Sequence, residues 1–230
     1  MTNMSNQAAS TTGGQAPVIW DLPTRLFHWI LVALFISSFL TAQAGGNWME
    51  WHFRSGYAIL TLIAFRIVWG FAGGRYARFR SFLFGPGRIL AYLRGAPDAP
   101  AGPGHNPVGA LSVFAMLLFI GAQAVLGLFA NDDIASEGPL AASVSKRTSD
   151  YLTGLHIANE PILIGLIGLH IVAIVWYRIF RRRNLVVPMI TGRDRQATPD
   201  AISSRDDARL RLAALAIVVI IAIGVWLLVR

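Results

Sequence analysis

Five apolar runs, each long enough to cross a membrane, constrain the fold of this chain more than any other feature. They lie at 27–44, 52–71, 106–130, 161–180 and 210–229, and only Arg54 and Arg66 interrupt the second. A helix of about 20 apolar residues spans the hydrocarbon core of a bilayer. We therefore predict an all-α integral membrane protein: a four-helix transmembrane bundle followed by one additional C-terminal transmembrane helix.

Composition supports lipid as the solvent and removes several kinds of chemistry. Only 14% of the 230 residues are charged, well below the share in soluble domains. Cysteine is absent, which excludes disulfides, thiolate metal sites, iron–sulfur clusters and covalently attached haem. Nineteen of the twenty cations are arginines grouped between the apolar runs, so the net charge of +8 reflects membrane topology rather than nucleic-acid binding.

The distribution of arginine predicts the orientation of the helices in the membrane. The segments 75–94 and 178–183 are rich in arginine and should be cytoplasmic, whereas 131–150 has an acidic balance that suits the periplasmic face. Residues 1–17 lack a basic and apolar signal pattern, and we expect them to be disordered and cytoplasmic. With five crossings, Arg230 ends on the periplasmic side.

Two cytoplasmic segments differ in character. Residues 79–95 (FRSFLFGPGRILAYLRG) alternate arginine with large apolar residues, as in helices that lie in the headgroup plane. Residues 193–209 are polar and predict a linker between a core at 18–192 and the additional helix at 210–230.

Four of the five histidines fall in or beside the predicted membrane helices, where an ionisable group indicates function. His156 and His170 are 14 residues apart, roughly 21 Å along one helix and close to a whole number of turns. Helix directions then place His52 at the depth of His156 and His28 at the depth of His170. The result is an outer pair, His52 with His156, and an inner pair, His28 with His170.

Two facing neutral imidazoles match the axial ligands of a six-coordinate haem iron. Zinc would need three or four ligands at one point, and the sequence offers no such cluster in the membrane. With both axial positions taken, such an iron moves electrons rather than binding a substrate. A single histidine would be better explained as a packed or hydrogen-bonded imidazole, but two matched pairs predict two b-type haems.

Two arginines are candidates for contact with haem propionates. Arg66 follows His52 by the same 14 residues that separate His156 from His170, so it should face the bundle interior at the inner pair's depth. Arg25 lies one turn before His28, with a snorkelling interfacial cation as the equal alternative.

Three further features are ambiguous in the sequence. His105 has no histidine partner at a matching depth, which favours a capping or hydrogen-bonding role. Pro161 should kink its helix or mark the regular start of it. Glycines in and beside these helices are consistent with space for a macrocycle, and equally with ordinary close packing of membrane helices; they are Gly56, Gly121, Gly127, Gly154, Gly165 and Gly168.

Several motifs together resemble the bacterial cytochrome b561 family, closest to its branch of b-type cytochrome subunits of nickel–iron hydrogenases. They are VIWDLPTRLFHW at 18–29, FRIVWGFAGGRYARF at 65–79, GHNPVGA at 104–110, GLFANDD at 127–133 and NLVVPMITG at 184–192. The resemblance implies a four-helix di-haem core in which the family's histidine ligands correspond to His28, His52, His156 and His170. The additional C-terminal helix and Pro161 depart from that pattern.

The resemblance also implies a function: electron transfer between a periplasmic-side partner, such as a c-type cytochrome or a hydrogenase subunit, and the membrane quinone pool. Two other functions stay open. One is a self-contained superoxide:quinone oxidoreductase, which would use Lys146 and Arg147 to attract its anionic substrate. The other is a haem-free membrane anchor or transporter. The sequence does not define the donor, the direction of electron flow, the quinone site or the oligomeric state, including a homodimer.

Overall fold

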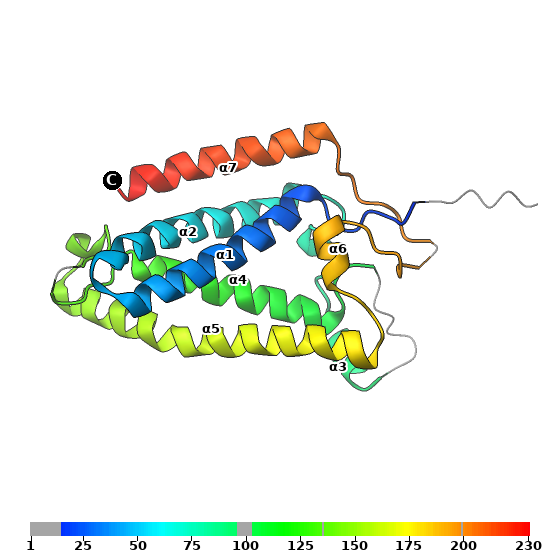
Figure 1. Cartoon of the computed structure of the whole chain (residues 1–230), viewed down its shortest axis with the longest axis horizontal. Helices are drawn as coiled ribbons and strands as arrows, with labels where there is room; N and C mark the ends of the chain where they lie inside the picture. The colour runs from blue at the N-terminus through cyan, green and yellow to red at the C-terminus, as the bar shows by residue number, and fades with distance from the viewer. Residues whose placement is uncertain (1–14, 96–102, 135, 199) are drawn as a thin grey trace, which may run out of the picture.

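The computed structural model describes residues 15–95, 103–134, 136–198 and 200–230. Of residues 1–17, which were expected to be disordered, 1–14 lie outside the described ranges, whereas Ala16 and Pro17 accept hydrogen bonds from Arg193 and the Asp194 N–H. The chain forms five long helices in the described residues, and they run along one axis in alternating directions (Figure 1). They are α1 (Leu22–Ala44), α2 (Met49–Ala72), α4 (Pro107–Gly127), α5 (Lys146–Phe180) and α7 (Ala208–Leu228). All five are long and apolar enough to cross a membrane.

Shorter elements join the long helices. The helices α3 (Pro86–Leu93) and α6 (Val186–Thr191) lie at one end of the bundle, together with the 3-10 turn η2 (Phe79–Ser81). The turns η1 (Gly46–Trp48) and η3 (Ala141–Ser143) lie at the other end. Among the described residues no strand forms beyond isolated bridges, so the prediction of an all-α membrane protein is confirmed.

Side-chain caps fix where four of the long helices begin. Asp21 accepts a hydrogen bond from the Thr24 N–H at 2.8 Å, and Asn106 accepts one from the Gly109 N–H at 2.7 Å. Ser145 and Asp207 do the same for α5 and α7. Each cap satisfies an N–H that the first helical turn leaves without a partner.

The helix that carries two of the histidines is longer than the sequence predicted. The apolar run begins at Pro161, but α5 begins at Lys146 and continues through Pro161 to Phe180. Of the two alternatives for Pro161, the regular start of the helix is excluded, because α5 is helical on both sides of this residue. Proline leaves one carbonyl without its intrahelical donor, a defect that membrane helices tolerate when neighbouring groups compensate.

The centre of the bundle is α2, which contacts α1, α4 and α7, while α5 packs on α4. The buried face of α2 carries Ile59, Ile63, Phe65 and Trp69. The additional helix α7 joins the same core through Ala214, which is buried against this cluster. The other faces of the long helices expose many large apolar side chains, as contact with lipid requires.

The predicted linker is a structured strap at the end of the bundle where α1 begins. The N–H of Ser204 donates to the carbonyl of Val18 at 2.6 Å, and the Val18 N–H donates to Ser203 Oγ at 3.2 Å. The hydroxyl of Ser204 accepts from the Arg75 N–H, and the Tyr76 hydroxyl donates to the Ile202 carbonyl. Residues 200–207 therefore hold the entrance of α1 to the end of α2.

The same end of the bundle carries most of the arginines, so we call it the arginine-rich end. It contains the start of α1, the end of α2, α3, the end of α5 and the start of α7. The described start of the chain and Arg230 lie at opposite ends of the bundle (Figure 1). This arrangement agrees with an odd number of crossings.

Candidate functional site

The four intramembrane histidines come from three helices. His28 lies on α1, His52 on α2, and His156 and His170 on α5. His28 and His170 are nearer the arginine-rich end, while His52 and His156 are nearer the opposite end, where α1 turns into α2. Each pair therefore joins one of the first two helices to α5.

The rings of His52 and His156 face each other across the bundle. Their centroids are 6.2 Å apart and their planes are almost perpendicular, at 87°. The structure therefore brings together the two residues that matched depth had paired, although they lie on helices that do not follow each other in the chain.

Backbone carbonyls orient both rings. The Nδ1 atom of His52 lies 2.9 Å from the Ser38 carbonyl oxygen and 3.1 Å from the Ser38 hydroxyl. The Nδ1 atom of His156 lies 3.0 Å from the Gln123 carbonyl oxygen. A carbonyl accepts only, so the ring proton belongs on Nδ1 and the lone pair belongs on Nε2, the arrangement found in metal-binding histidines.

A second layer of polar groups surrounds His156. The side-chain nitrogen of Gln123 lies 3.2 Å from His156 Nε2 and donates a hydrogen bond to it. Buried Asn159 donates to the Gln123 side-chain oxygen at 2.7 Å and to the Phe119 carbonyl. These contacts hold the Gln123 side chain beside Nε2 of His156, the ring nitrogen that would bind a metal ion.

Gly127 gives His156 its space. A Cβ atom at this position would lie 3.1 Å from His156 Cε1, closer than side chains normally approach. At Gly56, Gly154, Gly165 and Gly168 a Cβ would meet nothing within 4 Å. Close packing between protein atoms therefore explains Gly127 and does not explain those four.

The sequence did not predict the contacts made by Ser38, Gln123 and Asn159. All three are polar residues within apolar runs, and that is the signal that marks them. Their partners could not be foreseen, because two of the contacts to histidine use backbone carbonyls.

His28 and His170 lie near enough for their charges to interact. The Nδ1 atom of His28 is buried and has no hydrogen-bond partner among the described residues. Unlike the other pair, these two rings are not oriented by carbonyls in the described part of the chain. A buried ring nitrogen without a partner indicates a group that the protein chain itself does not supply.

Arg66 lies in the bundle interior, as predicted. Only 3% of its surface is exposed, and its guanidinium lies over the ring of Phe79 at 5.0 Å. Asp21 is near enough to interact with its charge, but Arg66 Nη1 is buried without a hydrogen-bond partner among the described residues. Arg66 thus has an unused donor of the kind that pairs with an anion.

Arg25 is held by the protein. Its Nη1 donates to the Ile190 carbonyl at 2.7 Å, and its Nη2 lies 3.6 Å from Asp206. Only Nε of this guanidinium is buried without a partner. Arg25 therefore joins α1 to α6 and to the strap.

His105 precedes α4 and is packed among aromatic rings. The centroid of its ring lies 4.5 Å from the ring centroid of Phe82 and 4.8 Å from that of Trp20. Burial, together with Arg66 and His170, lowers the pKa of His105 from 6.5 to about 3, so the ring is neutral. Asn106, not His105, caps α4, which rules out the capping role expected for the histidine.

These residues fit a haem. An iron bonded at about 2 Å to one nitrogen of each ring holds the two ring centres roughly 6 Å apart, which matches the 6.2 Å between His52 and His156. Nη1 of Arg66 and Nδ1 of His28 are buried without a hydrogen-bond partner among the described residues. In the part of the chain that the structure describes, no group of three histidines or carboxylates offers a site for a simple metal ion.

Fold and site together define a multi-pass helical membrane protein with paired histidines inside its bundle. Residues 19–192 match the family model of the prokaryotic cytochrome b561, and the chain belongs to this family. This match confirms the family resemblance seen in the motifs. Family membership implies a haem b protein that transfers electrons across the membrane. Comparisons with curated proteins and with solved structures find no match.

Proposed function

We propose that this protein carries electrons across a bacterial inner membrane through two haems b, one between His52 and His156 and the other between His28 and His170. The observation that carries the proposal is the 6.2 Å separation of the His52 and His156 rings, which leaves space for one six-coordinate iron. Arg66 is the proposed propionate partner at the second pair, and Arg25 a second candidate through its unpartnered Nε.

Haem iron supplies reversible one-electron chemistry when bound. The backbone carbonyls of Ser38 and Gln123 keep the ring protons on Nδ1, which leaves the Nε2 lone pair of each ring as the one that would bind iron. Two imidazoles per iron exclude other ligands, so the protein transfers electrons rather than activating oxygen. The two sites on α5 are separated by 14 residues, roughly 21 Å, and together they extend across most of the membrane.

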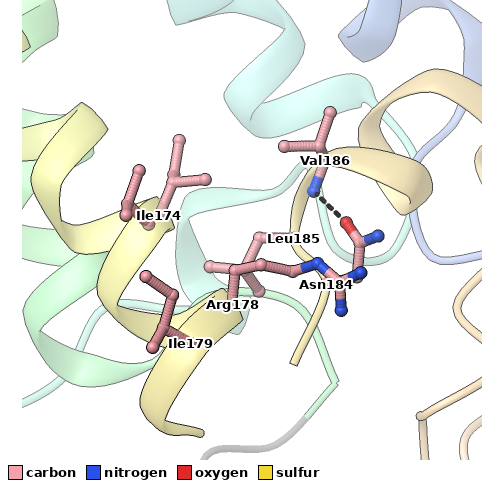
Figure 2. Close-up of a pocket in the computed structure, with 7 residues that line it drawn as sticks. Ile174, Arg178, Ile179, Asn184, Leu185 and Val186 are labelled. Carbon is pink, nitrogen blue, oxygen red and sulfur yellow. Dashed lines mark hydrogen bonds between the residues drawn. The ribbon is translucent and has the colours of Figure 1, made fainter. Parts of the chain in front are cut away.

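We propose that electrons enter at the end near His52 from a periplasmic c-type cytochrome or hydrogenase subunit, and leave to quinone at the arginine-rich end. A pocket of about 470 Å³ supports a quinone site there, lined by Ile174, Val175, Arg178, Ile179, Asn184, Leu185 and Val186 (Figure 2). His170, Ile174 and Arg178 are spaced four residues apart and share one stripe of α5. The guanidinium of Arg178 and the side-chain nitrogen of Asn184 are the proposed donors to a quinone carbonyl.

The charge pattern supports a cytoplasmic arginine-rich end, an N-terminus inside and Arg230 outside. In this proposal residues 18–192 are the electron-transfer unit, the strap within 193–209 attaches to it, and 210–230 are the additional helix. The superoxide alternative relied on Lys146, but its ammonium lies 2.5 Å from Asp133 and also pairs with Asp150. This pairing weakens the attraction of Lys146 for a small anion and disfavours the superoxide:quinone oxidoreductase alternative.

An absorption spectrum of the purified, dithionite-reduced protein with a pyridine haemochrome assay tests the proposal. We expect two haems b per chain. A chain that folds and inserts but contains no haem would instead support the anchor or transporter alternative.

A further inference from the structure

We propose that His105 binds a propionate of the haem between His28 and His170, acting together with Arg66. This inference rests on the proposed function, because it requires a haem at that pair. Two buried nitrogen atoms, Nδ1 of His105 and Nη1 of Arg66, have no hydrogen-bond partner among the described residues.

Aromatic rings connect these two donors and fix their positions. Arg66 lies over Phe79, and the ring of Phe79 lies 5.9 Å from that of Phe82. Phe82 in turn contacts His105, which Trp20 covers from another side. Both nitrogens, Nδ1 of His105 and Nη1 of Arg66, are buried beside this aromatic cluster.

Asp21, the carboxylate whose charge acts on Arg66, already accepts other hydrogen bonds. Asp21 accepts from the Thr24 N–H and, more weakly at 3.4 Å, from the Trp69 indole through one oxygen, and from the Gly74 N–H at 2.8 Å through the other. The acceptor for Arg66 and His105 is therefore another anion. A carboxylate attached to the group that His28 and His170 hold has the required charge and geometry.

The electrostatics place His105 near the same site. Both Arg66 and His170 act on the charge of His105, so the loop before α4 approaches the proposed haem position. His105 itself packs between Trp20 and Phe82 and has no ring contact with another histidine among the described residues. Its role is that of a donor to the periphery of the haem rather than an axial ligand.

Two substitutions separate donation from packing. His105→Phe keeps an aromatic ring between Trp20 and Phe82 but removes the N–H, whereas His105→Asn keeps an N–H close to the position of Nδ1. An ionised propionate without its donor stabilises the ferric state, since that state carries one more positive charge. We therefore expect His105→Phe to lower the equilibrium constant for reduction of one haem about tenfold, equal to 59 mV for a one-electron couple.

The measurement is an optical redox titration of both haems in the purified protein, with a haemochrome count on each sample. We expect both variants to keep two haems per chain, and His105→Asn to stay within about threefold of the wild-type equilibrium constant. The haem that shifts must be the one that His170→Ala removes. Loss of that haem in His105→Phe alone, with retention in His105→Asn, would also support donation.

Three results would overturn the inference. The first is a wild-type titration curve in His105→Phe, and the second is an equal shift of both haems. The third is an equal effect in Asp98→Asn, which removes an acid that precedes His105 in the sequence and would identify a protein acceptor. A wild-type protein without haem would instead refute the proposed function, and the two failures are thus distinguishable.

Discussion

Replacement of Asp21 should destabilise the bundle more than the loss of an ordinary helix cap. This carboxylate is 1% exposed and accepts from three donors: the Thr24 N–H in α1, the Trp69 indole in α2 and the Gly74 N–H just after α2. It caps α1 through the Thr24 N–H at 2.8 Å, and accepts from the Gly74 N–H at 2.8 Å just after α2. Asp21→Asn keeps the cap but turns an NH2 group toward one donor, which costs about 1–3 kcal/mol.

Asp21→Ala removes every acceptor at this position. We expect a loss of about 1 kcal/mol for the cap and about 1–3 kcal/mol for the buried Gly74 N–H, or roughly 3 kcal/mol in total. For a chain of this length that corresponds to a decrease in Tm of roughly 6–12 °C. Thermal unfolding in detergent, followed by the circular dichroism of the helices, measures this shift.

Ser145→Ala is the matched control, because Ser145 also caps a long helix but lies exposed at the start of α5. It should cost only about 1 kcal/mol. The order of Tm should be wild type, then Ser145→Ala, then Asp21→Ala, with Asp21→Asn above Asp21→Ala. Equal Tm values for Asp21→Ala and Ser145→Ala would refute the claim that Asp21 joins α1 to α2.

Two other expectations concern particular contacts. Gly127→Ala puts a methyl group 3.1 Å from His156 Cε1 and should reduce the haem count toward one per chain, whereas Gly165→Ala, in open space, should leave it at two; equal haemochrome counts would contradict the assigned contact. Asp206 has a lowered pKa because hydrogen bonds from Arg211 and the Leu22 N–H, with the charge of Arg25, outweigh the opposing effect of burial. Its contribution is therefore present above the ordinary value of 3.8 and is lost as pH falls through the lowered pKa. In the wild type, hydrogen exchange of residues 200–207, corrected for intrinsic rates, should accelerate as the pH falls below this value. In Asp206→Asn the same residues should already exchange fast at neutral pH.

The sequence predicted the features that depend on helix period and direction. Apolar runs of about 20 residues identified five spans, and the 14-residue spacing from His156 to His170 gave two depths. Helix direction then paired His52 with His156, whose rings do face each other. Burial of Arg66 followed from the same spacing, because 14 residues is nearly a whole number of turns.

The strap could not be predicted in the same way. Residues 193–209 have the composition of a flexible linker, yet Ser204 bonds to Val18 and Arg75 across most of the length of the chain. Such contacts depend on backbone groups and small hydroxyls, which carry no periodic signal. The start of α5 at Lys146 was missed for a related reason: its first turns are polar, and apolarity alone does not reveal where a helix begins.

Arg25 shows the limit of reasoning from spacing. Its place one turn before His28 predicted a propionate contact, but its two terminal nitrogens bind Ile190 and Asp206. Both partners lie more than 160 residues away in the sequence, so no local pattern could have indicated them.

The central claim is that four histidines form two separate sites, and a haemochrome count in two double variants tests it most directly. His52→Ala with His156→Ala should retain one haem per chain, because both changes affect one site. His52→Ala with His28→Ala should retain none. The account would be contradicted if the first variant lost both haems while the second, folded and inserted in the membrane, kept one.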